Sequence, residues 1–467
     1  RVLHHPFPRE VFMFEKLSLG FKFRYGLADM GFALITSAMQ FFLLFYYTDV
    51  AGINPALAGA ALMVGKLTWD ALNDPIFGYL SDRTRSRFGR RRIYMLIGAV
   101  PLGLAAWLMF SLPKGLTGVP AFLAVLLSFW LVDTFHTMTA TPYTALTPEL
   151  TRDYNERASL TSIRMVYSVF GYILGAALTT LLAGIFQGAG LNLQQAWSLT
   201  GGIFGLVAVI TIIVTTFSIK EDPEKSGEPS KLPPFKAVFI SFRNKPFVIL
   251  MIAFILSSFS FTMLTALVSY FIQYQLGMPE QISFVLLVML ATIGIFLIPA
   301  KLVSDRINKG PTYALGLFIA CLAIISAFFL PRGPSILIYI IAFIAGLGFS
   351  VQWVCPWSML PDVIEYDEEI TGERREGIYY GLWAFLTKFT SALGVAVSGW
   401  ALDLFGYVPN VEQTTRALLG IRLGFAIVPA IVIIISLPFL IWYPITRQKH
   451  AALVAKLAAR KAQQLEG

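Results

Sequence analysis

Residues 67–92 read LTWDALNDPIFGYLSDRTRSRFGRRR, an apolar segment that contains two aspartates and ends in a cluster of arginines. The apolar part suits a membrane-spanning helix, and the arginines are typical of the loop that follows one. Asp70 and Asp74 share one face of such a helix, about 6 Å apart along its axis. Because carboxylates are costly in lipid, we expect both to face the interior of a helix bundle.

The rest of the chain has the same membrane-protein character. Of its 467 residues, 56% are hydrophobic and 13% are charged, whereas a soluble domain has about 25% charged residues. Apolar runs of roughly 20 residues recur along the whole length. We therefore predict an all-α integral membrane protein with twelve spans, at 22–49, 57–81, 93–112, 120–147, 160–186, 197–218, 246–275, 281–304, 312–331, 335–360, 376–405 and 416–444.

The distribution of lysine and arginine predicts the orientation. The connections after the even-numbered spans hold most of these residues, whereas the alternate connections hold only Lys114, Arg332 and Arg416. The positive-inside rule then places the first set and both chain ends in the cytoplasm. The net charge of +9 indicates contact with anionic membrane lipids rather than with nucleic acid. We expect a multi-pass protein of the plasma (inner) membrane that takes a small-molecule substrate and functions as a monomer.

The chain reads as two halves that repeat each other. VAGINPALAGAAL…GYLSDR in the first half is answered by QLGMPEQISFVLL…AKLVSDR in the second. Six spans repeated twice are typical of a transporter built from two bundles around a central site. We predict an N-terminal six-helix bundle with a cation site at 1–219, a cytoplasmic linker at 220–245, a C-terminal six-helix bundle at 246–446 and a basic cytoplasmic tail at 447–467.

The stretch GYLSDRTRSRFGRRR (78–92) resembles the loop signature of the major facilitator superfamily, G-x-L-x-D-R followed by basic residues. The resemblance implies the twelve-helix major facilitator fold, with two six-helix bundles related by a pseudo-twofold axis, and a cytoplasmic gate. Gly78 would permit close helix approach, and Asp82 and the arginines would pair across the halves when the cavity faces outward. The alternative is that the arginines act only as a topological anchor. The candidate gate residues are Gly78, Asp82, Arg83, Arg91, Glu149, Arg157, Asp305 and Asp362.

The second copy of that loop, AKLVSDRINKG, has Lys301 where a small residue is expected, which predicts a weaker gate. The intramembrane acids also belong to one half only. When Asp305 is aligned with Asp82, the positions that correspond to Asp70 and Asp74 are Ile293 and Leu297. The repeated scaffold therefore does not need the acids, and one half has specialised.

WDALNDP (69–75) is similar to the second-helix motif of the glycoside–pentoside–hexuronide:cation symporters. Further ordered matches cover nearly the whole chain: FYYTDVAGINPALAG (45–59), TPYTALTPEL (141–150), SMLPDVIEYDEE (358–369) and FGYVPNVEQ (405–413). The resemblance implies symport of a solute with Na⁺, Li⁺ or H⁺, and no other cofactor.

On the matching positions, the family's cation site falls on Asp70, Asp74, Asn73 and Thr137, with Na⁺ between the two aspartates. Carboxylate, amide and hydroxyl oxygens are hard ligands of the kind such a cation prefers. Lys388 matches the family's helix-eleven lysine, which would couple cation and substrate binding. The alternatives are that the acids only bridge to a basic residue and that Lys388 only reaches a water-filled cavity.

The substrate positions depart from the family's sugar transporters. The two aspartates that bind sugar there correspond to Ala33 and Ala140, and a neighbouring lysine corresponds to Phe32. Arg164 and Trp353 remain at pocket positions, although Arg164 is near enough to the end of its span to snorkel and Trp353 is equally a packing aromatic.

Asp133 lies one turn before Thr137 and is a candidate coupling residue, either as a cavity carboxylate or as an additional cation ligand. This acid, the threonine and the PYTALT that follows also resemble the vertebrate sodium-coupled lysophosphatidylcholine symporters of the same wider family. Asp29 is expected either to contact the cargo or to form an ion pair with a loop arginine, and we favour the ion pair.

Two cargo hypotheses therefore remain open: a glycoside-like polar solute, which the size of the family favours, and a lysolipid or other amphiphile, which the lost sugar acids favour. A receptor or scaffold would have no reason to keep the asymmetric acids. The sequence contains no recognisable nucleophile–base set or phosphate loop, so it gives no indication of an enzyme.

Overall fold

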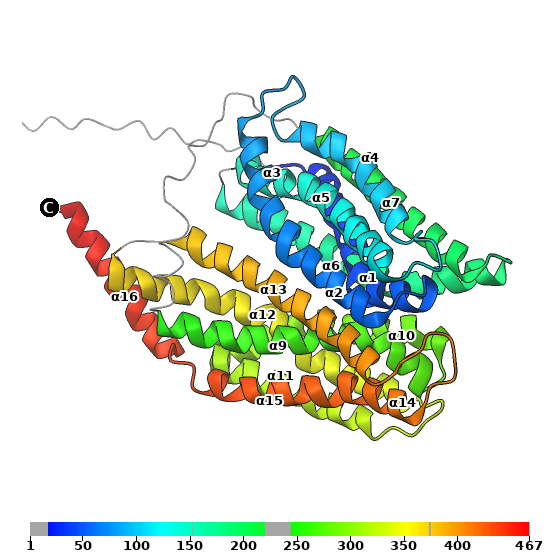
Figure 1. Ribbon diagram of the computed structural model, residues 1–467. Helices are drawn as coiled ribbons and strands as arrows, with labels where there is room; N and C mark the ends of the chain where they lie inside the picture. Colours follow the sequence, from blue (N-terminus) through cyan, green and yellow to red (C-terminus); the bar gives the residue numbers. More distant parts are fainter. Residues whose placement is uncertain (1–16, 152, 220–243, 373–374, 467) are drawn as a thin grey trace, which may run out of the picture.

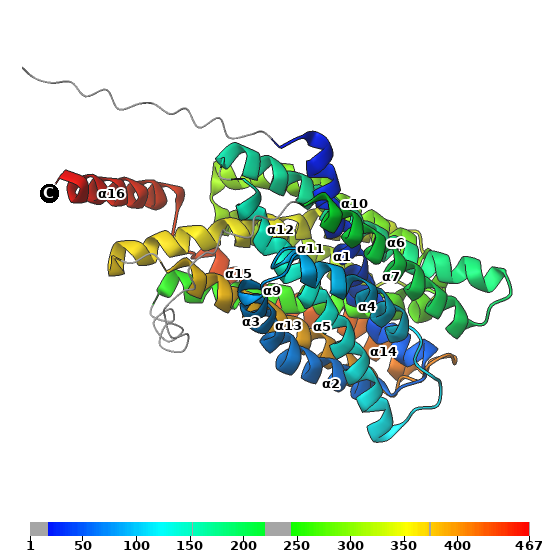
Figure 2. The same ribbon diagram turned by 90° about the horizontal axis from the view of Figure 1, so that it is seen from above.

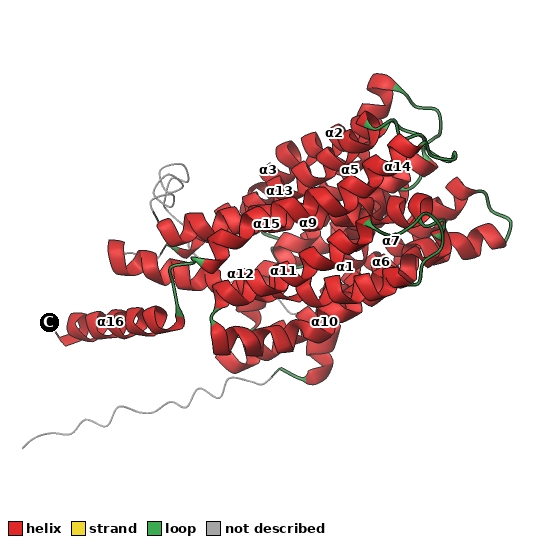
Figure 3. Ribbon diagram, turned by 90° about the horizontal axis from the view of Figure 1, so that it is seen from below, coloured by secondary structure: helices red, strands yellow, loops and turns green. Residues whose placement is uncertain are grey.

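A computed structural model provides the structure of the chain and describes residues 17–151, 153–219, 244–372 and 375–466. The described residues form helices and loops without any strand (Figure 3). The predicted linker at 220–245 lies almost wholly outside the described residues.

The helices follow one another along the chain with short connections. Their bounds are α1 (Leu19–Phe45), η1 (Tyr46–Val50), α2 (Pro55–Gly65), η2 (Lys66–Asp70), α3 (Ala71–Arg83), α4 (Arg92–Met109), α5 (Gly118–Leu150), α6 (Tyr154–Gly188), α7 (Leu193–Ser218), α9 (Lys245–Tyr270), η3 (Phe271–Gln275), η4 (Pro279–Gln281), α10 (Ile282–Ile307), α11 (Lys309–Phe328), α12 (Leu337–Thr371), α13 (Glu376–Leu404), α14 (Thr415–Arg422), η5 (Leu423–Ile427), α15 (Val428–Ile441) and α16 (Arg447–Glu466).

These helices match the predicted spans in order and position. In the described part of the chain, 11 helices are long and apolar enough to cross a membrane. The remaining predicted span, 57–81, corresponds to α2, η2 and α3, where the π-helical segment η2 interrupts the α-helix. The largest difference is in α12, which continues past the predicted end at residue 360 to Thr371. The acidic turns beyond the apolar run remain helical until Gly372, whose φ of 74° ends the helix.

The helices of each half pack mainly on one another (Figures 1 and 2). In the first half α1 packs on α6 and α7, and α4 packs on α5 and α7. In the second half α9 packs on α13 and α15, and α12 packs on α10 and α11. The halves meet where α2 contacts α13, α6 contacts α10 and α1 contacts α9. This is the twelve-helix architecture of two six-helix bundles.

The repeat is visible in local backbone geometry. The π-helical turn η1 follows α1, and the π-helical turn η3 follows α9 at the equivalent place. The amide of Ile53 donates to the carbonyl of Tyr47 (2.8 Å), and the amide of Met278 donates to that of Ile272 (3.0 Å). The two halves thus end their first helices in the same way.

Glycine allows α2 and α13 to approach closely. A Cβ on Gly399 would lie 2.3 Å from the carbonyl oxygen of Pro55, and one on Gly59 would lie 3.2 Å from Cα of Ala396. The close approach expected at Gly78 is not present in this conformation, because a Cβ there would meet only a methyl of Thr141 at 3.9 Å. The tight contact between the halves is therefore in the first part of α2, not at the end of α3.

Candidate functional site

A cavity of about 250 Å³ lies between the two halves, with walls from α1, α2, η2, α3, α5, α9 and α13. It brings together five of the predicted site residues from both halves of the chain. These are Asp70, Asp74, Asp133, Thr137 and Lys388.

Lys388 forms the centre of the predicted cation site. Its Nζ lies 2.6 Å from Oδ1 of Asp70 and 2.6 Å from Oδ2 of Asp74, and it also donates to the backbone carbonyl of Asp70. Among the described residues, these are the ion pairs that join the two halves. The ammonium balances one of the two carboxylates, so the group keeps one negative charge available for a cation.

Asn73 and Thr137 are the other two predicted cation ligands, and Asn73 does not line the cavity. Asn73 is fully buried and its Nδ2 donates to Oδ2 of Asp133 (2.5 Å), which leaves its Oδ1 without a described hydrogen-bond partner. Thr137 lines the cavity and is buried. The carboxylates of Asp70 and Asp74 and the hydroxyl of Thr137, which share the cavity wall, are hard oxygen ligands of the kind that Na⁺ prefers.

Asp133 lines the same cavity but is held by Asn73. Within the described residues, no three His, Cys, Asp or Glu side chains converge on one metal position. In this conformation Asp133 is therefore a cavity carboxylate, and it does not complete a three-carboxylate cluster with Asp70 and Asp74.

Three positions that correspond to the family's sugar-binding residues lie outside the cavity wall. The ring of Phe32 packs edge-on against His136 (5.2 Å between ring centroids), and Ala33 is buried beside it. Ala140 packs against the apolar core of the first half. None of the three lines the cavity.

Arg164 is engaged in a buried ion pair. Its guanidinium donates to both carboxylate oxygens of Asp29 (2.8 and 3.1 Å) and to Thr147 (2.6 Å), and it lies over the ring of Tyr143. Asp29 does pair with an arginine, but the expectation of a loop arginine is wrong, because the partner comes from within α6. With its donors used in this way, Arg164 does not face the cavity.

Trp353 also lies away from the main cavity. Its ring packs edge-on against Tyr172, with the centroids 5.7 Å apart, and 42% of the residue is exposed. It borders a separate apolar cavity of about 60 Å³ between α6, α10 and α12, together with Leu290 and Leu297.

The predicted gate residues of the first half pair with one another. Arg91 contacts Asp82 (2.8 Å) and Glu149 (3.0 Å). Arg83 lies over the ring of Tyr79, with 4.1 Å between guanidinium carbon and centroid. We call this end of the molecule, which carries the loop at 83–92, the arginine-rich end.

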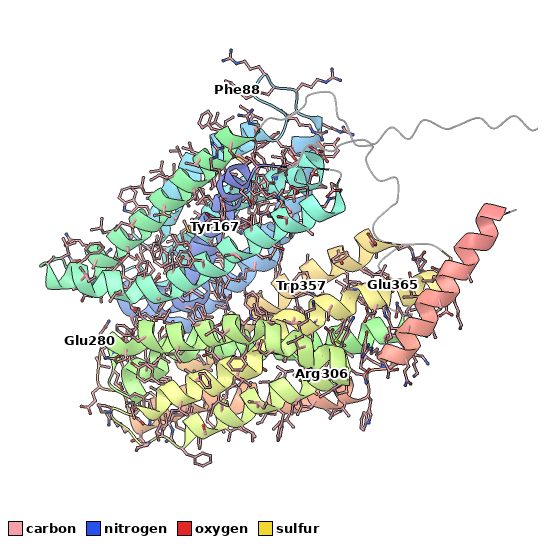
Figure 4. The ribbon with its side chains drawn as sticks, turned by 180° about the vertical axis from the view of Figure 1, so that it is seen from behind. Phe88, Tyr167, Glu280, Arg306, Trp357 and Glu365 are labelled. Carbon is pink, nitrogen blue, oxygen red and sulfur yellow. The ribbon has the colours of Figure 1, made fainter. Side chains whose placement is uncertain are left out.

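The gate residues of the second half also stay within their half. Lys309 pairs with Asp362 (2.6 Å), and the backbone carbonyl of Asp305 accepts from Arg447 (3.0 Å). In the first half Arg157 donates to the backbone carbonyl of Thr151 (3.4 Å). Among the described residues, each ion pair at this end thus lies within one half. Figure 4 shows the halves diverging there, with Phe88 of the first half and Glu365 of the second well apart.

The opposite end is closed by hydrogen bonds between the halves. The carboxylate of Asp49 is buried and accepts hydrogen bonds from the hydroxyls of Thr48, Tyr274 and Tyr407, the last at 2.6 Å. Nδ2 of Asn410 donates to the backbone carbonyl of Asp49 (2.6 Å). We call this set of residues the Asp49 latch and this end the Asp49 end.

Sequence reasoning missed the latch, although a signal was present. If Gly52 is aligned with Gly277 in the two repeats, Asp49 corresponds to Tyr274. Equivalent positions at the first helix end of each half meet at a pseudo-twofold axis, and these two side chains form a direct hydrogen bond. Sequence reasoning also missed Lys66 and His136, which line the cavity. The signal for Lys66 was a lysine inside a predicted span.

Comparisons with known proteins agree with this fold. Residues 24–447 match the model of the family described as MFS/sugar transport protein. An uncharacterized symporter of Synechocystis is 31% identical, over 96% of this chain and 98% of its own. The isoprimeverose transporter of Lactiplantibacillus pentosus is 28% identical, over 92% and 91%. The sodium-dependent lysophosphatidylcholine symporter 1-A of Danio rerio is 27% identical, over 93% and 87%.

Solved structures share the architecture. The nucleoside transporter NupG has a TM-score of 0.64 at 15% identity, covering 90% of this chain and 99% of its own. An inward-facing bacterial homologue of the human lysosomal transporter Spinster has a TM-score of 0.67 at 14% identity, covering 92% and 97%. The fold and the family match are those of a multi-pass membrane transporter of the major facilitator type. Within that class, the chain belongs to the MFS/sugar transport protein family, and its relatives include symporters.

Proposed function

We propose that the protein is a Na⁺-coupled symporter that moves a glycoside-like small solute by alternating access. The observation that carries the proposal is the ammonium of Lys388 between the carboxylates of Asp70 and Asp74, at the wall of the central cavity. Asp70, Asp74 and Lys388 together have one net negative charge, and a bound Na⁺ brings the group to neutrality. An intramembrane charge is then fully compensated only in the loaded state.

Coupling follows from the position of Lys388 on the second half and of the acids on the first. A cation that takes oxygens from Asp70 and Asp74 weakens the ion pairs that hold α13 against η2 and α3. The free energy of cation binding therefore acts on the relative position of the halves, as alternating access requires.

The two ends of the molecule supply the opposing gates. Positive-inside asymmetry places the arginine-rich end in the cytoplasm, so that this conformation is closed to the outside by the Asp49 latch. In the opposite conformation the latch opens, and charged residues such as Asp82, Arg91 and Asp362 exchange partners within a half for partners in the other. The transporter works in the plasma membrane as a monomer, because one chain supplies both halves of the cavity.

The size of the cavity supports a small solute as the cargo. Its volume of about 250 Å³ is below the roughly 300–1,000 Å³ typical of pockets for drug-sized ligands. The isoprimeverose transporter is a relative over most of the chain. A lysolipid or other amphiphile is the second candidate, because Leu43, Leu44, Leu62 and Val132 make much of the wall apolar.

The experiment replaces the acids one at a time. Asp70→Asn and Asp74→Asn should each abolish the rise in Tm that Na⁺ produces in the purified protein and the Na⁺ stimulation of uptake. The matched control is Glu412→Gln, which removes a charge from an exposed pair with Arg332. Full Na⁺ stimulation in either aspartate variant contradicts the proposal.

A further inference from the structure

A groove of about 500 Å³ lies where the tail helix α16 meets the ends of α9 and α12. Its walls are the first turns of α9, the last turns of α12, the segment that follows α15 and one face of α16. Figure 1 shows α16 beside the end of α12. The groove shares no residue with the central cavity, so it is a separate site.

Three lysines from two distant parts of the chain line this groove. Lys245 begins α9, and Lys449 and Lys456 lie on α16. Lys456 pairs with Glu369 (3.0 Å), whereas Lys245 and Lys449 have no ion-pair partner among the described residues. Three lysines and one glutamate give the lining a net charge of +2. A groove with uncompensated positive charge attracts an anion.

One face of α16 joins this charge to an apolar surface. The residues of α16 at the groove have the i, i+3, i+4, i+7 spacing of a single helix face. They are Lys449, Ala452, Leu453 and Lys456. Ile249 of α9 lines the same groove. The groove therefore offers both ammonium groups and aliphatic side chains, which fits a ligand that is anionic and amphiphilic.

The groove also lies at the level of the membrane surface. The spanning helix α15 ends at Ile441, and Ile441 and Trp442 are 56% and 77% exposed. Tryptophan at the end of a spanning helix is typical of the zone between lipid chains and headgroups. Pro444 of the groove follows two residues later. The positive-inside rule places this end in the cytoplasm, and the cytoplasmic leaflet carries anionic lipids.

We propose that this groove binds an anionic phospholipid of the cytoplasmic leaflet. The phosphate lies at Lys245 and Lys449, and the first part of an acyl chain lies against Ile249 and Leu453. A free inorganic anion would satisfy the lysines but leave the aliphatic wall in water, whereas a phospholipid covers both. One bound lipid contacts α9 and α16 together, so it holds the tail on the second half.

Native mass spectrometry of the purified full chain tests the proposal. The delipidated protein receives equal amounts of phosphatidylglycerol and phosphatidylcholine with the same acyl chains, and the readout is the ratio of the two among the first bound lipids. Only phosphatidylglycerol has a net negative charge, so the wild-type protein should bind it in preference. Equal binding of the two lipids overturns the proposal.

Variants then assign the preference to the groove. Lys245→Gln combined with Lys449→Gln should lower the ratio about fivefold for each lysine, or roughly 25-fold in all. The same two positions changed to arginine should keep most of the preference. Both lysines are exposed, so the Tm without lipid should match that of the wild type.

The matched control is Lys301→Gln combined with Arg306→Gln, which removes two exposed positive charges from α10, outside the groove. This control should keep the wild-type ratio. A groove variant that keeps the full preference, or a control that loses as much of it, overturns the assignment to the groove.

Soluble anions distinguish a lipid site from a general anion site. Inorganic phosphate and glycerol 1-phosphate carry the charge without an acyl chain, so neither should displace phosphatidylglycerol from the wild-type protein. If either displaces it at a concentration comparable with that of the lipid, the groove is a site for a soluble anion, and the assignment to a phospholipid is overturned.

Discussion

Single residues decide whether charge is tolerated inside this bundle. Lys388 is satisfied by two carboxylates, whereas Arg164 is satisfied by one carboxylate, a hydroxyl and an aromatic face. The first group borders a cavity and the second does not. The same kind of ion pair thus borders the central cavity in one place, where we propose a cation site, and is enclosed between helices in the other.

Lys388→Gln tests the first of these roles. The change leaves Asp70 and Asp74 without their counter-ion. In the absence of Na⁺ we expect the free energy of unfolding to fall by about 1–3 kcal/mol. This is less than the loss expected for a fully buried pair, because the side chain of Asp74 is partly exposed. Na⁺ should then raise the Tm of the variant more than that of the wild type. A variant with an unchanged Na⁺ response would show that Lys388 does not belong to the site; Lys301→Gln is the control.

Asp29→Asn tests the second role. The change strips the buried guanidinium of Arg164 of its carboxylate, for an expected loss of about 3–5 kcal/mol. Thermal unfolding should show the lower stability, while the Na⁺-induced rise in Tm persists because the pair lies outside the cavity. If stability were retained and the cargo response lost, Asp29 would be a cargo ligand instead.

At the scale of elements, π-helical turns set the positions of the important side chains. The segment η2 aligns Lys66, Asp70 and Asp74 on one wall, and the equivalent turns η1 and η3 bring Asp49 and Tyr274 together. Single π-helical turns inside α-helices are frequent at functional sites. Here they lie where each half has to align charged or polar groups toward the other.

Asp49→Asn tests the latch. The carboxylate accepts hydrogen bonds from three hydroxyls, and charge-assisted bonds of this type contribute about 1.5–3 kcal/mol each. Weakening them should favour the conformation that opens at the Asp49 end. A cysteine at the cavity position Ser391 should then react faster with a membrane-impermeant maleimide added outside intact cells.

The control for the latch is Glu412→Gln, which removes a carboxylate from an exposed pair at the same end. The parent chain, which contains buried Cys321 and Cys355, gives the background labelling. Equal labelling rates with and without Asp49→Asn would mean that the latch does not hold this end closed.

At the scale of the whole molecule, the two ends are in opposite states. The halves are joined through the Asp49 latch and diverge toward the arginine-rich end (Figure 4). The tail helix α16 packs on α12, with Lys456 paired to Glu369, and its Arg447 donates to the carbonyl of Asp305 in α10. These contacts are all with the second half, so we expect the tail to move with that half.

Alternating access predicts two distances at the arginine-rich end. Spin labels at Thr84 and Gly377, one in each half, should report a long distance for the conformation described above and a shorter one for its alternate. Asp49→Asn should increase the population with the shorter distance. One distance that no variant or Na⁺ concentration changes would rule out the proposed cycle for this chain.

Much of the fold and part of the site are predictable from the sequence, and particular residues show why. Span positions follow from apolar length alone, and the acids stand out because lipid does not tolerate Asp70 and Asp74. Matching to the family located Lys388 beside them. It did not show that Phe32, Ala33 and Ala140 lie behind the cavity wall, or that Arg164 is already paired, because facing direction depends on neighbouring helices.

By itself the sequence determined the twelve helices, their division into two repeats and the presence of intramembrane acids in the first repeat only. These properties are local, since hydrophobic length and charge spacing act within one span. Only the tertiary structure decided which charges meet, which carboxylate closes one end, and that Lys66 and His136 line the central cavity. Those contacts join residues such as Asp49 and Tyr407, separated by 358 positions, and they depend on how two helical bundles are placed against each other.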